Sequence, residues 1–126
     1  MLQARMKSNR PVYLNLRHIR QPLPAIVSFL HRVSGAFLFL GIPLLLIVFE
    51  ASLAGQDSFV ATLGNPLIKF ALFTLLTAYF YHFFAGLRFL LLDLGWGVAL
   101  TQARRASWAV LMAAAFCAAS LGAWLW

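Results

Sequence analysis

The sequence predicts an all-α integral membrane protein with three transmembrane helices, and three observations lead to that fold class. Of the 126 residues, 63% are hydrophobic and only 10% are charged, and the mean hydropathy is +0.85, far above the balance of a soluble domain. Three apolar stretches each reach the length of about 20 residues with which a helix crosses the hydrocarbon core. None shows the period-2 alternation of barrel strands, so all three should be helices.

The expected spans cover about residues 25–49, 66–92 and 106–126, and they leave no room for an extramembrane domain, so residues 1–126 form a single membrane domain. Residues 1–24 are basic but lack the short apolar core and the small-residue cleavage site of a secretory signal. We therefore expect them to be retained as a cytoplasmic segment. The segment is also short and rich in proline for a mitochondrial transit peptide, which favours a bacterial inner membrane over the mitochondrial one.

Local features refine this outline. Pro43 lies inside the first span and should bend it. Residues 51–65 have a turn composition and are expected to form a short connector. Span three carries small residues at helical spacing, which should form a face for close helix packing: Ala115, Ala118, Ala119 and Gly122.

The distribution of charge indicates both partner and orientation. A net charge of +7 could suggest nucleic acid, but the basic residues cluster beside the spans rather than on a folded surface with stacking aromatics. We therefore expect a lipid bilayer and no nucleic acid. The N-terminal segment and the second loop, with Arg104 and Arg105, hold most of the cations. The positive-inside rule then places the N-terminus in the cytoplasm and the C-terminus outside.

A polar motif opens the first span, "SFLHRVSG" at residues 28–35. Ser28, His31 and Arg32 are spaced i, i+3 and i+4, so they project from one side of a helix. Membrane arginines are costly and usually functional, and we interpret the group as one polar site in the inner half of the bilayer. The alternative is that Arg32 reaches back to the interface while Ser28 bonds to its own helix.

A second motif ends span two, "YHFFAGLRFLLLDLGWG" at residues 81–97. His82 precedes Asp93 by 11 residues, about 16 Å of helix, so it approaches the depth of the first motif. Gly86 lies one turn on and leaves room beside the imidazole for a flat ring or a close helix. A neutral imidazole is a good axial ligand for haem iron, but an interhelical hydrogen bond to Ser, Thr or a carbonyl explains the residue equally well.

Near the inner boundary, Arg88 and Asp93 could form a surface ion pair, or the carboxylate could relay protons; the residues leave both open. His18 precedes the first span and should be interfacial. Cys117 has no partner cysteine in the chain. Gly-rich phosphate loops, zinc-ligand spacings and a Ser-His-Asp set on a soluble scaffold are missing from the sequence.

Together the motifs identify a family. "RPVYLNL" followed by "LPAIVSFLHRVSG", then "YHFFAGLRFLLLDLGWG", resembles the large cytochrome b anchor subunits of succinate dehydrogenase. Their pattern is Arg-Pro, then Ser-x-x-His-Arg-x-[Ser/Thr]-Gly, then His-x-x-x-Gly-[Ile/Leu]-Arg-x-x-x-x-Asp-x-Gly. The number and order of spans also agree. The match covers the N-terminal segment, the start of span one and the end of span two.

The resemblance implies a subunit of succinate:ubiquinone oxidoreductase that forms a helix bundle with a second, smaller anchor beside an iron-sulfur subunit and a flavoprotein. It implies that His82 is one axial ligand of a haem b shared with the second anchor. His31 and Arg32 would border the haem propionates, and Ser28 and Arg32 would donate hydrogen bonds at the ubiquinone site. The chain alone is not expected to oxidise succinate. Many members carry a second histidine where this chain has Phe89, so any role of that histidine does not transfer.

Two other functions stay open at this point. A quinol:fumarate reductase anchor would use the same parts in the reverse direction, and the sequence does not fix the direction. A small transporter subunit would need a carboxylate at mid-membrane, whereas Glu50 and Asp93 end their spans.

Overall fold

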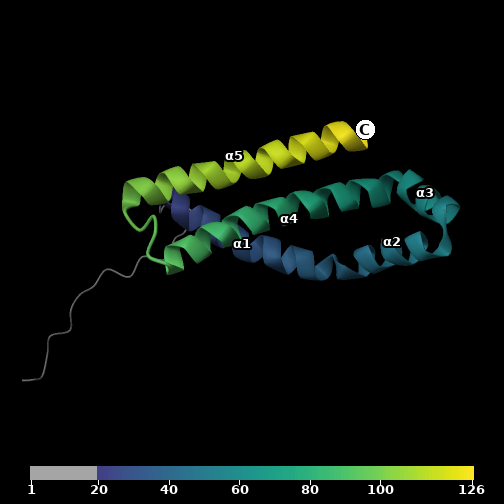
Figure 1. Ribbon diagram of the computed structural model, residues 1–126, viewed down its shortest axis with the longest axis horizontal. Coiled ribbons are helices and arrows are strands. Elements are labelled where there is room, and N and C mark those ends of the chain that lie inside the picture. The colour runs from purple at the N-terminus through teal and green to yellow at the C-terminus, as the bar shows by residue number, and fades with distance from the viewer. Residues whose placement is uncertain (1–19) are drawn as a thin grey trace, which may run out of the picture.

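The computed structural model describes residues 20–126, and within that range it contains helices and no strand. The N-terminal segment with His18 and the Arg-Pro motif lies outside the described residues. In chain order the helices are α1 (Leu23–Leu40), α2 (Ile42–Ala54), α3 (Gln56–Gly64), α4 (Pro66–Asp93) and α5 (Leu100–Leu125). Figure 1 shows α1 and α2 running the length of the bundle, α3 turning at its far end, α4 returning, and α5 running out again.

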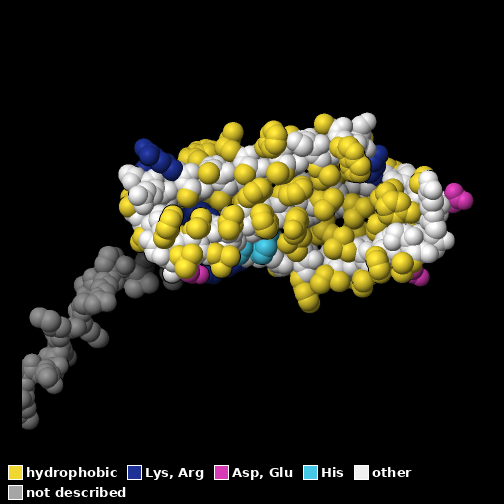
Figure 2. Space-filling view, in the orientation of Figure 1, with side chains coloured by type: hydrophobic (Ala, Val, Ile, Leu, Met, Phe, Trp, Pro, Cys, Tyr) yellow, Lys and Arg dark blue, Asp and Glu magenta, His cyan; other side chains and the backbone are white. Residues whose placement is uncertain are grey.

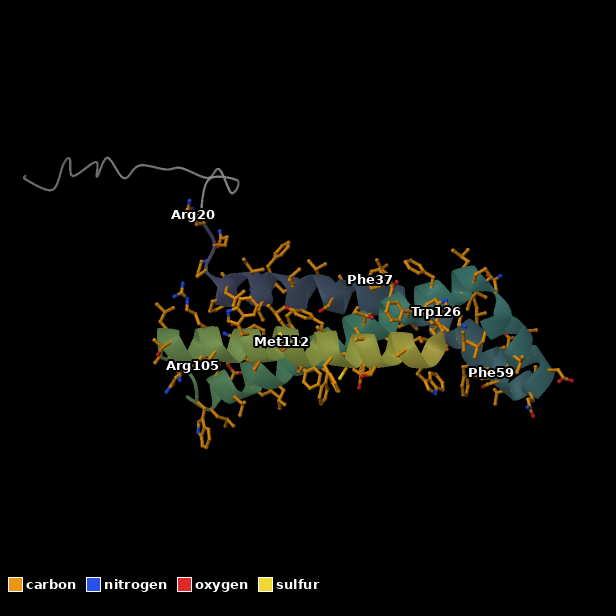
Figure 3. All side chains as sticks on the ribbon, turned by 90° about the horizontal axis from the view of Figure 1, so that it is seen from above. Arg20, Phe37, Phe59, Arg105, Met112 and Trp126 are labelled. Carbon is orange, nitrogen blue, oxygen red and sulfur yellow. The ribbon has the colours of Figure 1, made fainter. Side chains whose placement is uncertain are left out.

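Three of these helices, α1, α4 and α5, are long and apolar enough to cross a membrane, which confirms the predicted fold class. Hydrophobic side chains cover the visible surface along most of its length, whereas charged side chains gather at the two ends (Figure 2). Arg20 and Arg105 lie at one end, and Phe59 and Trp126 at the other (Figure 3). Such a belt of exposed apolar residues suits contact with lipid or with other transmembrane helices.

The first span is interrupted at Gly41, as the position of Pro43 predicts. Proline has no N–H and crowds the carbonyl one turn back, so α1 cannot continue through it unchanged. The Gly41 N–H bonds to the carbonyls of Phe37 at 3.0 Å and Leu38 at 3.1 Å, and α2 begins at the next residue. The span is therefore two helical segments joined at a glycine rather than one bent helix.

Gly41 also sits where α4 comes closest. A Cβ at this position would overlap Leu75 Cδ1 and would lie 2.8 Å from Leu75 Cδ2, and Leu75 is only 3% exposed. We expect Gly41→Ala to lower the free energy of unfolding by about 1 to 3 kcal/mol, the usual cost of overpacking. The thermal midpoint in detergent should fall accordingly.

The matched control is Gly64→Ala. Gly64 is the last residue of α3, and a Cβ there meets no atom within 4 Å. Because alanine favours a helix over glycine by about 0.5 to 1 kcal/mol, this variant should hold or raise the thermal midpoint. If Gly41→Ala behaves in the same way, the close contact between the bend and α4 is wrong.

Two predicted loops are in fact largely helical. The expected connector at residues 51–65 contains α3. Within it, the helix is interrupted at Gly55, which has φ 121°. Asn65 caps the start of α4, because its side-chain oxygen accepts a hydrogen bond from the Leu67 N–H at 2.9 Å. The second loop is shorter than expected. Arg104 and Arg105 belong to the first turns of α5, since arginine is a good helix former and its head can reach water from there.

The packing stripe of α5 differs in part from the predicted face of small residues. Ser107, Val110 and Ala114 are the buried residues of α5. Gly122 continues the contact, because a Cβ there would touch the ring of Phe73 at 3.5 Å. Ala115 and Ala119, by contrast, are exposed. Small size permits close approach, but it does not say which side of the helix turns toward its neighbour.

Candidate functional site

The two polar motifs meet at the contact between α1 and α4. The imidazole rings of His31 and His82 stack with their centroids 4.1 Å apart and their planes within 13° of parallel. This confirms that the motifs reach the same depth from opposite directions along the chain. Neither histidine is fully buried, and histidine colour is visible on the face drawn in Figure 2.

The Nδ1 atom of His82 is held by two oxygens of α1. It lies 3.1 Å from the backbone carbonyl of His31 and 3.0 Å from the Ser34 hydroxyl, and that hydroxyl itself donates to the same carbonyl at 2.9 Å. A carbonyl can only accept, so Nδ1 carries the proton and Nε2 keeps the lone pair of the neutral ring. Among the described residues, no hydrogen bond uses Nε2.

His82 therefore makes the interhelical hydrogen bond that the sequence analysis gave as the alternative to haem ligation. The two interpretations are compatible, because they use different nitrogens of one ring. Metal-ligating histidines usually donate their second ring N–H to a carbonyl, carboxylate or water, which sets the tautomer and the ring orientation. His82 already has that arrangement.

Two glycines allow the rings to come together. A Cβ at Gly35 would lie 2.9 Å from His82 Cε1, closer than real Cβ contacts permit, and one at Gly86 would lie 3.4 Å from His31 Nε2. The space predicted beside His82 at Gly86 is therefore taken by the ring of His31 on a close helix. The third ring in the group is Phe89, centred 5.1 Å from His31.

Ser28 and Arg32 are not drawn into this contact. Arg32 is exposed and Ser28 is half-buried, one turn apart on the flank of α1 beside the histidines. The expected single face therefore divides: His31, with Ser34 and Gly35, meets α4, while Ser28 and Arg32 make no hydrogen bond within the part of the chain that the structure describes. The division follows from the rotation of α1, which spacing alone does not set.

Arg88 and Asp93 do not form the surface ion pair that was considered. Arg88 is only 6% exposed, whereas Asp93 is exposed at the end of α4. The Nε and Nη1 atoms of Arg88 are buried and have no hydrogen-bond partner among the described residues. The guanidinium lies 5.2 Å from the centre of the Phe89 ring, a contact that offsets part of its desolvation.

Sequence reasoning missed two bonds between α1 and α4. Ser34 was part of the motif but had no assigned role, and Tyr81 was not considered. The Tyr81 hydroxyl donates to the Val27 carbonyl at 2.8 Å, and Val27 is fully buried. Sequence position could have indicated both residues, because Tyr81 is next to His82 and Ser34 lies one helical turn after His31.

The described residues contain no group of three or more His, Cys, Asp or Glu side chains that could hold a metal ion. Cys117 is free. A metal at His82 would therefore need its remaining ligands from outside these residues, as an iron held in a macrocycle does.

Comparisons with known proteins show the family to which this chain belongs. A family model described as the succinate dehydrogenase/fumarate reductase transmembrane subunit matches residues 6–121. The chain belongs to this family. The resemblance drawn from the two motifs is thus confirmed, and this chain is a membrane anchor of the succinate dehydrogenase cytochrome b type.

Individual relatives match over most of their length. The succinate dehydrogenase cytochrome b556 subunit of Coxiella burnetii is 34% identical over 125 residues, covering 96% of this chain and 100% of the relative. That of Paracoccus denitrificans is 32% identical and covers 83% of each chain. The mitochondrial cytochrome b560 subunit of Mus musculus is 34% identical, covering 92% of this anchor and 72% of the relative.

Proposed function

We propose that this anchor is part of a succinate:ubiquinone oxidoreductase, where it supplies one axial ligand of a haem b and part of the site at which ubiquinone is reduced. The observation that carries the proposal is the oriented imidazole of His82. Its Nδ1–H faces the His31 carbonyl, and its Nε2 lone pair has no partner among the described residues. A lone pair left unpaired at this depth is costly unless something binds it.

The residues around His82 fit a haem. The ring orientation is fixed by the hydrogen bonds at Nδ1 and by the close approach of Gly35, so little reorganisation is needed when iron is bound. His31 and Arg32 would interact with the propionates, because a guanidinium can bind a carboxylate through two parallel hydrogen bonds. When bound, the haem supplies a one-electron redox centre.

Ser28 and Arg32 would bind ubiquinone. Both lie on the open flank of α1 rather than inside the bundle, so a flat headgroup could reach them from the side. A quinone carbonyl that gains electrons becomes a strong acceptor, and a hydroxyl and a guanidinium aimed at it stabilise the developing negative charge. The exposed apolar surface of the helices would accommodate an isoprenoid tail.

The remaining parts would come from other chains. The second axial ligand would belong to a smaller anchor subunit that covers the open side of the histidine pair. An iron-sulfur subunit and a flavoprotein would deliver electrons from succinate. The transporter alternative has no support, because the three acidic residues of the chain are Glu50, Asp57 and Asp93, and all are exposed at helix ends or in the turn region.

The relatives favour succinate oxidation over fumarate reduction, because those compared are named as succinate dehydrogenase subunits. We propose a bacterial inner membrane, since the match extends over the whole of the Coxiella burnetii subunit. Arg20, Arg104 and Arg105 would face the cytoplasm at the N-terminal end of the bundle, in keeping with the positive-inside rule.

The test is to purify the assembled complex by an affinity tag on this chain. We expect it to bring down three further subunits, to show a reduced-minus-oxidised spectrum of a six-coordinate b-type haem, and to reduce ubiquinone with succinate faster than it reduces fumarate with quinol. A complex without haem would overturn the ligand assignment. A faster quinol:fumarate reaction would reverse the direction.

A further inference from the structure

A second candidate site lies between α4 and α5, close to the loop that joins them. It is a pocket of about 500 Å³ with almost entirely apolar walls, within the range of small-molecule and cofactor sites. Arg88 and Arg105 are its cationic residues, and Gln102 is its other polar side chain. No carboxylate is among the described residues that line it.

Arg88 is the feature that calls for a ligand. Only 6% of its surface is exposed. Two of its three guanidinium nitrogens, Nε and Nη1, have no hydrogen-bond partner among the described residues. A buried charge left unpaired in an apolar site is strongly destabilising. An anion in the adjoining pocket would remove that cost.

The two arginines lie at one level of the membrane. Arg88 is five residues from the end of α4 at Asp93, and Arg105 is five residues from the start of α5 at Leu100. Each is thus about 7 to 8 Å from the loop along its helix. That depth lies just below the lipid headgroups, within reach of a phosphate drawn slightly inward.

The apolar walls continue away from the arginines toward the middle of the bundle, along Leu87 and Phe84 on α4 and Ala109 and Ala113 on α5. The two arginines therefore lie on the loop side of a long apolar wall, with a shorter apolar stretch of Leu91, Leu92 and Trp96 between them and the loop. This is the polarity of a phospholipid. Basic pockets between transmembrane helices on the cytoplasmic side favour anionic headgroups.

The pocket opens on the side of α4 opposite the histidines. At about 100° per residue, Leu87 and Leu91 lie about 140° and 180° around the helix from His82. A second anchor that covers His82 would leave this groove uncovered. This step rests on the proposed function, whereas the charge and shape of the pocket do not.

We infer that the α4–α5 pocket binds an anionic phospholipid, with its phosphate paired to Arg88 and Arg105 and an acyl chain along Leu87 and Ala109. Phosphatidylglycerol is a suitable probe, and phosphatidylcholine with the same acyl chains is the matched zwitterionic lipid. The site would join this anchor to the cytoplasmic leaflet and neutralise a buried cation.

The experiment uses the assembled complex, stripped of lipid in detergent and exposed to equal amounts of the two lipids. Native mass spectrometry then counts the bound molecules. We expect phosphatidylglycerol to be retained about tenfold more than phosphatidylcholine. Arg105→Gln should reduce that preference at least threefold, whereas Arg104→Gln, an adjacent arginine that does not line the pocket, should not.

A second pair of variants tests the apolar end. Ala109→Phe fills the pocket, while Ala119→Phe adds the same ring at an exposed position of α5 outside it. The first should lower lipid retention and the second should not. Both positions are exposed, so folding should survive even if Arg88→Gln prevents assembly.

Three outcomes would overturn the inference: equal retention of the two lipids, equal effects of Arg104→Gln and Arg105→Gln, or a photo-crosslinker at residue 109 that captures a subunit of the complex instead of lipid. Haem content is recorded in each variant. Loss of the lipid preference in Arg105→Gln with full haem content would support this site independently of the proposed function. A complex without haem that still prefers phosphatidylglycerol would contradict only the proposed function.

Discussion

Replacement of His82 by alanine should remove haem from the assembled complex. The substitution deletes Nε2, which has no hydrogen-bond partner among the described residues, while the Ser34 hydroxyl and the His31 carbonyl that orient the ring remain on α1. The ring of His31 is centred 4.1 Å from that of His82, so it would have to shift to take over as the ligand. We expect haem per complex to fall at least tenfold, measured as the pyridine haemochrome and as the reduced-minus-oxidised difference spectrum.

The control removes another aromatic side chain from the same helix. Tyr79 is exposed on α4, and Tyr79→Ala should leave the haem content unchanged. Subunit composition is measured for both variants, so that loss of haem is separated from loss of assembly. A His82→Ala complex with full haem content and an unshifted spectrum would show that the ligand is another residue.

A milder variant tests the orientation of the ring. Ser34→Ala removes one of the two oxygens at His82 Nδ1 and leaves the other, so haem should still bind. Weaker hydrogen bonding at Nδ1 makes the imidazole a poorer electron donor, which favours the reduced iron. Loss of a hydrogen bond worth about 0.5 to 1.5 kcal/mol corresponds to a rise in midpoint potential of about 20 to 60 mV for one electron. A potential unchanged or lowered would contradict the role given to Ser34.

The second large effect is expected at Arg32. Arg32→Gln keeps a hydrogen-bond donor but removes the charge from the open flank of α1. Charge-assisted hydrogen bonds are worth about 1.5 to 3 kcal/mol, so succinate:ubiquinone reductase activity should fall about 10- to 100-fold. Ser28→Ala removes a neutral donor on the same flank and should cost less, about threefold to tenfold.

Succinate oxidation with a soluble dye is the internal control, because it bypasses the quinone and should be unchanged in both variants. Ser120→Ala provides a matched serine: Ser120 is exposed on α5, and within the described residues its hydroxyl donates to the Phe116 carbonyl of its own helix. Full ubiquinone turnover in Arg32→Gln and Ser28→Ala together would place the quinone site elsewhere.

The spans could be predicted because their signal is local. A helix in lipid satisfies its own backbone, so about 20 apolar residues in a row predict it with no knowledge of its neighbours. The same local chemistry predicted the interruption at Pro43 and the shared depth of the two motifs. Helix ends were less well predicted, since Arg104 and the residues of α3 are compatible with either a helix or a loop.

What the sequence by itself determined is therefore the class of protein, the number of spans and the identity of the polar residues in the two motifs of α1 and α4. Only the tertiary structure decided which of them meet: Ser34 rather than Ser28 contacts His82, and Arg88 is buried rather than paired with Asp93. The physical reason is rotation. Spacing sets which residues share a side of a helix, but the side that turns inward is chosen by packing against the neighbouring helices, here by the close contacts at Gly35, Gly41 and Gly86.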